Sequence, residues 1–153
     1  MSRILALRLS ALGDVAMTVP VIHSFAESFP GSEVVVVSRE KWGALFANMP
    51  ANVRFYGIDL QEYGGLRGLE RLFGELRREG FDAVADFHNV LRTKYLDMRF
   101  RMAGVPVAVI NKGRREKKEL TRQHNKKLVQ LKSSTERYAD VLAKLGFSFD
   151  LDF

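Results

Sequence analysis

The stretch from Arg3 to Pro20 constrains the fold of this chain more than any other part of the sequence. Ile4 to Leu9 is a short apolar run in which Arg8 is the single charged residue. A run of this length, bounded by turn residues, is typical of a strand buried on both faces, as in a parallel sheet. Small residues and Gly13 then predict a tight turn, and a helical pattern follows Asp14. We therefore expect Asp14 at the carboxyl end of a strand, where open α/β sheets bind ligands.

The rest of the chain alternates between short apolar runs and helical patterns. Further strands are expected at 33–38, 53–58, 81–87 and 107–110. Helices are expected at 15–29, 41–48, 66–79, 90–102 and 134–145. This alternation predicts an α/β fold with a doubly wound parallel sheet.

Two helix starts need a capping residue or a kink. Pro20 lies inside the first helical pattern, so either Thr18 caps a helix that begins there or the helix is kinked. Asn89 is a candidate N-cap for the helix at 90–102.

Three stretches resemble one known family. The segment Arg-Leu-Ser-Ala-Leu-Gly-Asp-Val-Ala-Met-Thr-Val-Pro at 8–20 resembles the N-terminal signature of the heptosyltransferase-like glycosyltransferases, glycosyltransferase family nine. Residues 81–93 and 135–138 resemble later stretches of that family, in the same order and at matching spacing. The resemblance implies a Rossmann-like sheet that is the N-terminal half of a two-domain GT-B fold. Residues 1–146 would form the acceptor-side domain, and 147–153 would begin a linker to a C-terminal donor-binding domain.

The resemblance also implies roles for the first turn. Asp14 would be the catalytic base that deprotonates the acceptor hydroxyl. The cleft floor would be shaped by the loop residues Ser10, Ala11, Leu12 and Gly13. From its position alone, Asp14 could instead cap the first helix, because carboxylates are favoured at helix N-termini. The two roles can coexist.

A second group of candidates follows the expected fourth strand. If the strand order reverses between the first and fourth strands, both carboxyl ends flank one crevice. The helix after Asn89 would then point its free N–H groups at this crevice, which suits an anion. The candidate acceptor-binding residues here are His88, Asn89, Arg92 and Lys94. The alternative is that Arg92 and Lys94 are solvated surface residues and that His88 is a hydrogen-bonded structural residue.

Positive charge is concentrated in residues 111–132. This segment has nine Lys and Arg residues against two Glu, so it carries a net +7 while the rest of the chain carries −1. Such a concentration of positive charge indicates that this one segment binds an anionic partner. With the resemblance, the partner would be a phosphorylated acceptor of the lipopolysaccharide type, held by Arg114, Arg115, Lys117 and Lys118. The alternative is an independent anion- or nucleic-acid-binding domain, although the segment lacks the interleaved aromatic residues that stack on bases.

Several other classes of protein fit the sequence poorly. Gly13 alone does not make the Gly-x-Gly-x-x-Gly turn of a nicotinamide-binding domain. The first strand lacks the adjacent carboxylates of a receiver domain's magnesium site. There is no cysteine, so disulfides and thiolate metal sites are excluded. The resemblance implies no metal and no cofactor, and it implies a nucleotide-sugar donor such as ADP-heptose that is bound mainly by the second domain.

The location of the protein is expected from its apolar runs. The N-terminus lacks the pattern of a secretory signal. No apolar run approaches the roughly 20 residues that a membrane-spanning helix needs. We expect a soluble cytoplasmic protein that contacts the inner face of the membrane peripherally.

Overall fold

Five parallel strands lie side by side in one sheet, in the order β3-β2-β1-β4-β5. The strands are β1 (Arg3–Leu7), β2 (Glu33–Arg39), β3 (Val53–Ile58), β4 (Ala83–Asp86) and β5 (Val107–Val109). The computed structural model describes residues 2–111 and 134–151. The strand order reverses between β1 and β4, so the doubly wound parallel sheet predicted from the sequence is confirmed.

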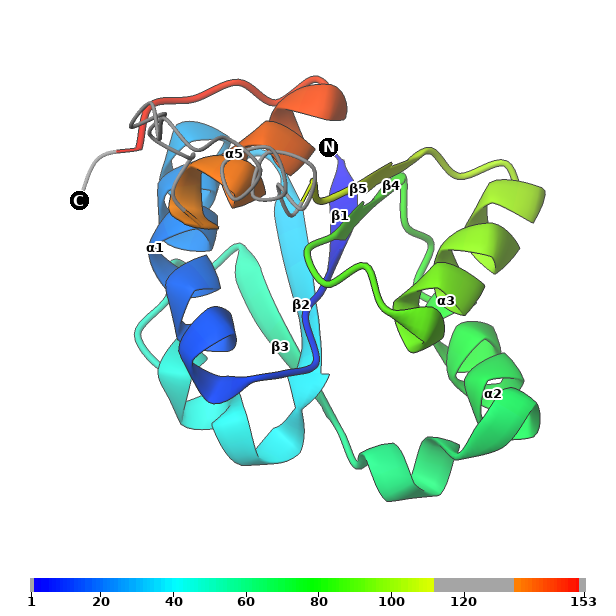
Figure 1. Ribbon diagram of the computed structural model, residues 1–153. Coiled ribbons are helices and arrows are strands. Elements are labelled where there is room, and N and C mark those ends of the chain that lie inside the picture. The colour runs from blue at the N-terminus through cyan, green and yellow to red at the C-terminus, as the bar shows by residue number, and fades with distance from the viewer. Residues whose placement is uncertain (1, 112–133, 152–153) are drawn as a thin grey trace, which may run out of the picture.

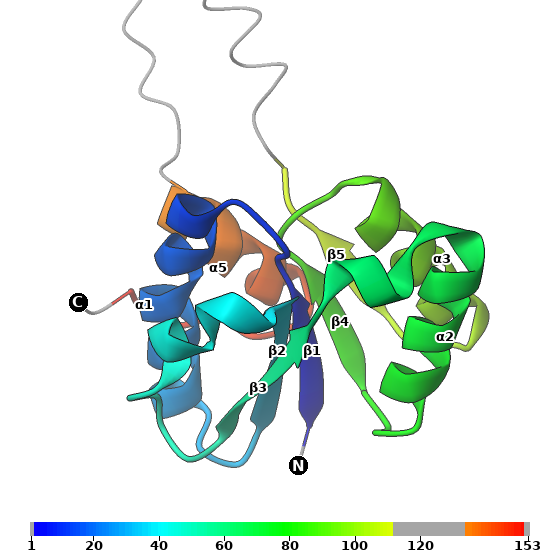
Figure 2. The same cartoon turned by 90° about the horizontal axis from the view of Figure 1, so that it is seen from below.

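Helices cover both faces of the sheet (Figures 1 and 2). The α-helices are α1 (Leu12–Ser28), α2 (Gly65–Arg77), α3 (Leu91–Met102) and α5 (Ser134–Lys144). Two 3₁₀ segments, η1 (Glu40–Phe46) and η2 (Leu60–Tyr63), follow β2 and β3. Helices α1 and α5 pack on one face, and α2 and α3 pack on the other. None of the described helices combines the length and apolar character needed to cross a membrane.

The alternation of side chains along β1 explains why its sequence is apolar throughout. Ile4 and Ala6 belong to the core beneath α1 and α5, whereas Leu5 and Leu7 belong to the core beneath α2 and α3. All four are buried because β1 is central and pairs with both β2 and β4. A central parallel strand has no solvated face, so polar alternation is absent from its sequence.

Two helix starts differ from those expected. Helix α1 begins at Leu12 and continues through Pro20, so the alternative in which Thr18 caps a helix that begins there is wrong. Asn89 is not the N-cap of α3 but adopts a left-handed backbone conformation with φ 54°, which Asn tolerates better than most residues. The N-cap is Val90, and its N–H donates to the Thr93 hydroxyl at 2.9 Å. The Thr93 hydroxyl, and not the Asn89 side chain, therefore makes the side-chain hydrogen bond at this helix start.

One glycine in α2 is required by a close approach of the backbone. A Cβ atom on Gly68 would lie 2.2 Å from the backbone carbonyl carbon of Tyr63. Gly74, in the same helix, has nothing within 4 Å of its would-be Cβ. The tight corner between η2 and α2 therefore depends on Gly68, while Gly74 is replaceable.

The end of the described chain packs back on α1. The Phe147 ring lies 5.1 Å from the Phe25 ring, and the Phe149 ring lies 5.8 Å from it. Leu151 also packs against this core. The division into a domain at 1–146 and a linker at 147–153 stays a prediction.

Candidate functional site

Asp14 lies in the first turn of α1, directly after the carboxyl end of β1. The N-cap of the helix is Ala11, so the alternative that Asp14 caps it is wrong. The Asp14 side chain is 51% exposed, and its Oδ2 atom lies 2.9 Å from Nη2 of Arg8. Its carboxylate has no other polar partner among the described residues. It therefore presents an acceptor to solvent in an orientation that Arg8 sets.

Arg8 joins the ends of two strands. Its side chain is only 10% exposed, and Nη1 donates to the backbone carbonyl of Phe87 at 2.9 Å. The same guanidinium thus contacts Asp14 after β1 and the turn after β4. The sequence analysis did not select Arg8 as a site residue. The available signal was its position as the only charged residue in the apolar run from Ile4 to Leu9.

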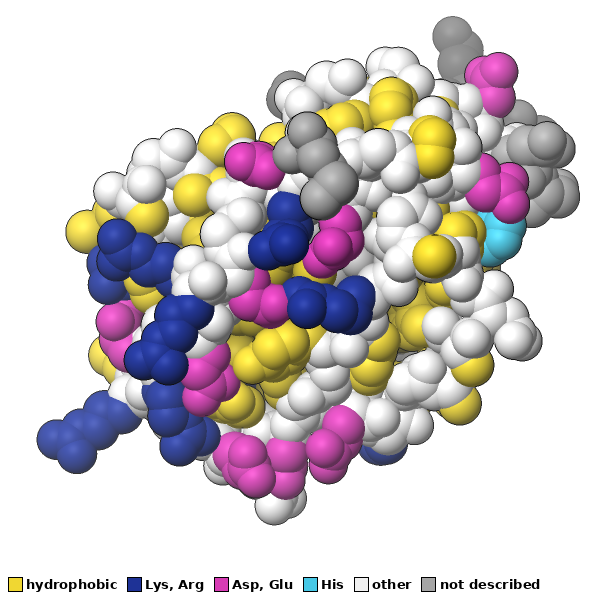
Figure 3. Space-filling model, turned by 180° about the vertical axis from the view of Figure 1, so that it is seen from behind, with side chains coloured by type: hydrophobic (Ala, Val, Ile, Leu, Met, Phe, Trp, Pro, Cys, Tyr) yellow, Lys and Arg dark blue, Asp and Glu magenta, His cyan; other side chains and the backbone are white. Residues whose placement is uncertain are grey.

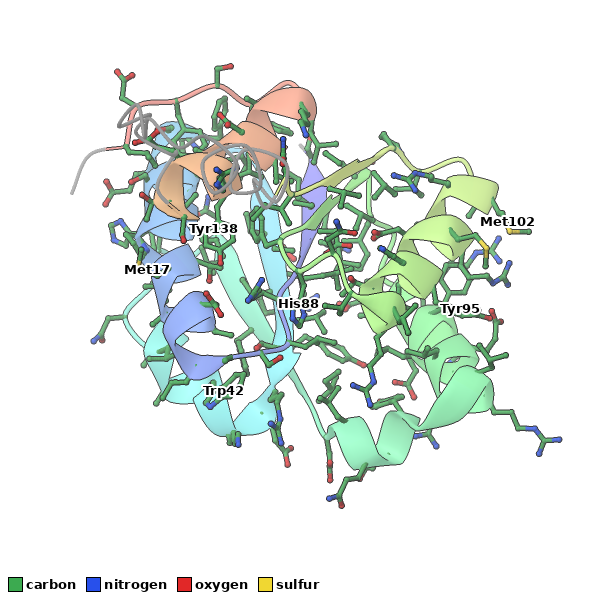
Figure 4. All side chains as sticks on the ribbon, viewed as in Figure 1. Met17, Trp42, His88, Tyr95, Met102 and Tyr138 are labelled. Atoms are coloured by element: carbon green, nitrogen blue, oxygen red, sulfur yellow. The ribbon has the colours of Figure 1, made fainter. Side chains whose placement is uncertain are left out.

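The turn after β4 is built on the carboxylate of Asp86. This fully buried side chain accepts the N–H groups of His88 at 2.8 Å and Asn89 at 2.9 Å through its Oδ1 atom. The Leu9 N–H donates to Nδ1 of His88 at 3.3 Å. Because Nδ1 is an acceptor, the neutral imidazole carries its proton on Nε2. The side chain of His88 thus connects this turn to the chain just after β1 (Figure 4).

Tyr138 of α5 contacts the start of α1 on the face of the sheet that these two helices share. Its hydroxyl donates to the backbone carbonyl of Asp14 at 3.2 Å. Its ring packs against Phe87 with centroids 5.0 Å apart. Burial raises the pKa of Tyr138 above its ordinary value, the Asp14 charge adds to this and the Arg8 charge opposes it. Tyr138 therefore acts as a neutral donor that helps to hold Asp14.

A cavity of about 850 Å³ lies between the starts of α2 and α3. Its lining residues are Gly65, Leu66, Leu69, Asn89, Val90, Leu91, Arg92 and Tyr95. Two of the predicted acceptor-binding residues, Asn89 and Arg92, therefore share one cavity. His88 is buried and Lys94 is exposed, and neither of them lines the cavity. The Tyr95 hydroxyl donates to Glu70, and this hydrogen bond raises the pKa of Tyr95.

Charged side chains are distributed unevenly over the described surface. Lys and Arg residues gather over the side of the molecule formed by α2 and α3, with acidic residues between them (Figure 3). The predicted phosphate-binding residues Arg114, Arg115, Lys117 and Lys118 lie outside the described residues. Within the described ranges, no group of three or more His, Asp or Glu side chains is placed to hold a metal ion.

The structure brings most of the predicted site to one edge of the sheet. Ser10 to Asp14 follow β1, and His88 to Arg92 follow β4. The contacts of Arg8 with Phe87 and of Leu9 with His88 tie these two segments together. The segments after β1 and β4 therefore lie side by side where the strand order reverses, and Asp14 is half-exposed there, whereas the cavity beside α2 and α3 is lined by Asn89 and Arg92 and not by Asp14.

No protein-family model matches this sequence, and neither does any curated protein. Solved structures do match its fold. A family nine glycosyltransferase from Veillonella parvula superposes with a TM-score of 0.68 at 20% identity, over 99% of this chain and 45% of that one. The Escherichia coli heptosyltransferase WaaC with ADP superposes with a TM-score of 0.65 at 20% identity, over 98% of this chain and 49% of that one. The complex of WaaC with ADP-2-deoxy-2-fluoro heptose gives a TM-score of 0.67 at 19% identity.

This chain spans about half the length of the solved structures that it matches. At this level of identity the comparison bears on the fold and not on the chemistry. The described chain therefore has the Rossmann-like fold found in one half of family nine glycosyltransferases, and the resemblance carried by its first motif is confirmed at the level of the fold.

Proposed function

We propose that this chain is the acceptor-binding half of a glycosyltransferase that moves a heptose or related sugar from a nucleotide sugar to an acceptor of the lipopolysaccharide-core type. Asp14 is the general base. The observation that carries this proposal is the geometry of Asp14, a half-exposed carboxylate at the carboxyl edge of β1 where the strand order reverses. This edge is the ligand-binding edge of open α/β sheets.

In the proposed reaction, the main role of the described residues is to supply a proton acceptor in a fixed position. In the proposed step, the Asp14 carboxylate takes the proton of an acceptor hydroxyl while the oxygen of that hydroxyl attacks the anomeric carbon of the donor. The bond from that carbon to the nucleoside diphosphate breaks, and the diphosphate leaves with the electron pair. Arg8 and Tyr138 hold Asp14 in place from two sides, which supports the precise placement that general base catalysis needs.

The two ligands are assigned to different parts of the protein. The WaaC structures contain ADP and an ADP-sugar analogue, which supports a nucleotide-sugar donor for this protein. We assign the donor mainly to a second domain and the acceptor to the edge of the sheet beside Asp14. Asn89 and Arg92 contribute to the acceptor side through the cavity that they line. The Lys and Arg residues of the segment 111–132 would bind the acceptor phosphates, at the cytoplasmic face of a membrane.

The test is glycosyl transfer by the intact protein that contains this chain. Asp14→Asn should retain acceptor affinity and lower the transfer rate about 10²–10⁴-fold, the range for loss of a general base. Glu27→Gln is the matched control, because it removes one exposed carboxylate from the other end of the same helix. Product formation is followed by mass spectrometry with ADP-heptose and a phosphorylated core acceptor. Near-normal turnover of Asp14→Asn would remove Asp14 from the mechanism.

A further inference from the structure

Two buried carboxyl groups meet between the sheet and α3, behind the site. Asp86 of β4 is 0% exposed and Asp97 of α3 is 1% exposed. Oδ2 of Asp86 and both carboxyl oxygens of Asp97 are buried and accept no hydrogen bond from any described N–H or O–H group. Three unsatisfied buried carboxylate oxygens would cost several kcal/mol if both groups were ionised.

One shared proton gives two of these three oxygens a hydrogen-bond partner. A carboxylic acid O–H on one residue can donate to the carboxylate oxygen of the other, as in other buried carboxyl pairs. Asp86 already accepts two backbone N–H groups through Oδ1, which leaves its Oδ2 as the acceptor. Asp97 accepts none among the described residues, so it carries the proton. Consistently, burial raises the pKa of Asp97 well above its ordinary value, and the hydrogen bond to Asp86 and the charge of Asp86 raise it further.

The surrounding elements supply little competing charge. Strand β5 contributes no titratable side chain in Val107–Val109, and β4 contributes only Asp86. On α2, Glu70 is paired with Tyr95 and Arg99 on α3. Arg101 on α3 opposes the shift of Asp97 without abolishing it. The imidazole of His88, after β4, accepts from Leu9.

We propose that Asp97 is a positioning residue whose protonated carboxyl donates to Oδ2 of Asp86 and thereby sets the turn at 86–89. The Phe87 carbonyl in this turn accepts a hydrogen bond from Arg8, and Arg8 forms the ion pair with Asp14. The claim that this arrangement matters for catalysis rests on the proposed function. The claim of a shared proton does not, because it follows from the burial and hydrogen bonding of this chain alone.

The sign of the pH dependence follows from the raised pKa. Asp97 binds a proton in the folded state and loses it on unfolding at any pH between its unfolded value, about 3.9, and its folded value. The free energy of unfolding therefore falls as pH rises through this window. The unfolding constant should rise about tenfold per pH unit for this one proton.

The experiment measures urea unfolding of residues 1–153 between pH 5 and pH 8 for the wild type and Asp97→Asn. Asparagine has nearly the same shape and donates an N–H to Asp86 without titrating. In the variant, the tenfold rise of the unfolding constant per pH unit that comes from the Asp97 proton should be absent. Its unfolding constant should therefore be far smaller than that of the wild type at pH 8. Asp150→Asn is the matched control, because it removes an exposed carboxyl in the described tail and should leave the slope unchanged.

Two spectroscopic readouts separate a shared proton from a merely structural role. The ¹³C shift of the Asp97 carboxyl should be that of a neutral acid at pH 7. The amide shifts of His88 and Asn89 should be preserved in Asp97→Asn and displaced in Asp97→Ala, which removes the donor. If the alanine variant does not fold, the wild-type carboxyl shift and the asparagine slope still decide the matter.

The proposal is overturned if the Asp97 carboxyl is ionised at pH 7, or if Asp97→Asn has the same pH slope as the wild type. Failure of the proposed function looks different. In that case Asp14→Asn would retain transfer activity in the intact protein while the Asp97 measurements came out as expected.

Discussion

Replacing Arg8 with methionine removes one of the two contacts that tie the segment after β1 to the segment after β4. Methionine has a similar length and fits a buried position, so the change isolates the guanidinium. The hydrogen bond from Arg8 to the Phe87 carbonyl involves a charged donor, and losing such a bond costs about 1.5–3 kcal/mol. The ion pair with half-exposed Asp14 adds at most about 1 kcal/mol because water competes for that carboxylate.

One term opposes these losses. Nε of Arg8 is buried and has no hydrogen-bond acceptor among the described residues, so the wild-type guanidinium contains one unsatisfied N–H group. Removing it relieves a desolvation cost that offsets part of the lost bonding. We expect Arg8→Met to destabilise the chain by about 1–2 kcal/mol, which lowers the melting temperature by about 2–8 °C for a domain of this size.

The assay is urea unfolding at pH 7 in a double-mutant cycle with Asp14→Asn. The two changes share one ion pair, so their effects should be non-additive by about 0.5–1 kcal/mol. Arg67→Met, at an exposed position on α2, is the control for removing a cation. A neutral effect of Arg8→Met, or strict additivity with Asp14→Asn, would refute the assignment of Arg8 as the link between β1 and β4.

Three further predictions concern the rest of the chain. Gly68→Ala should destabilise the domain by at least about 2 kcal/mol, because its Cβ would clash with the Tyr63 backbone, whereas Gly74→Ala should stabilise it by up to about 1 kcal/mol; urea unfolding compares the pair. In calorimetric titrations, residues 1–153 alone should bind ADP- and UDP-sugars with at most about millimolar affinity, because donor contacts are assigned to another domain; micromolar binding would indicate a nucleotide site within this chain. Neutralising four cations together should weaken salt-dependent acceptor binding by the intact protein and leave the melting temperature of this domain little changed, and unchanged affinity at low salt would contradict the role assigned to Arg114, Arg115, Lys117 and Lys118.

Much of the fold was predictable because it follows from local patterns. Short apolar runs at β1 to β5 alternate with helical periodicity, and that alternation is typical of a parallel sheet with helices on both faces. The position of Asp14 after the first strand also follows from the local order of strand, turn and helix. Helix starts were predicted less well. At α1 the first turn includes Leu12 to Asp14, and at α3 a threonine hydroxyl took the place of asparagine capping.

The sequence by itself therefore determined the elements, the edge of the sheet where Asp14 lies and the concentration of positive charge in one segment. Only the tertiary structure decided which side chains act together. Arg8 and Phe87 are 79 positions apart, and they meet because β1 pairs with β4. Asp86 and Asp97 meet because α3 packs on the face toward which Asp86 points. Periodicity reports which face a residue takes, whereas the partner across that face depends on strand order and helix packing, which no local pattern contains.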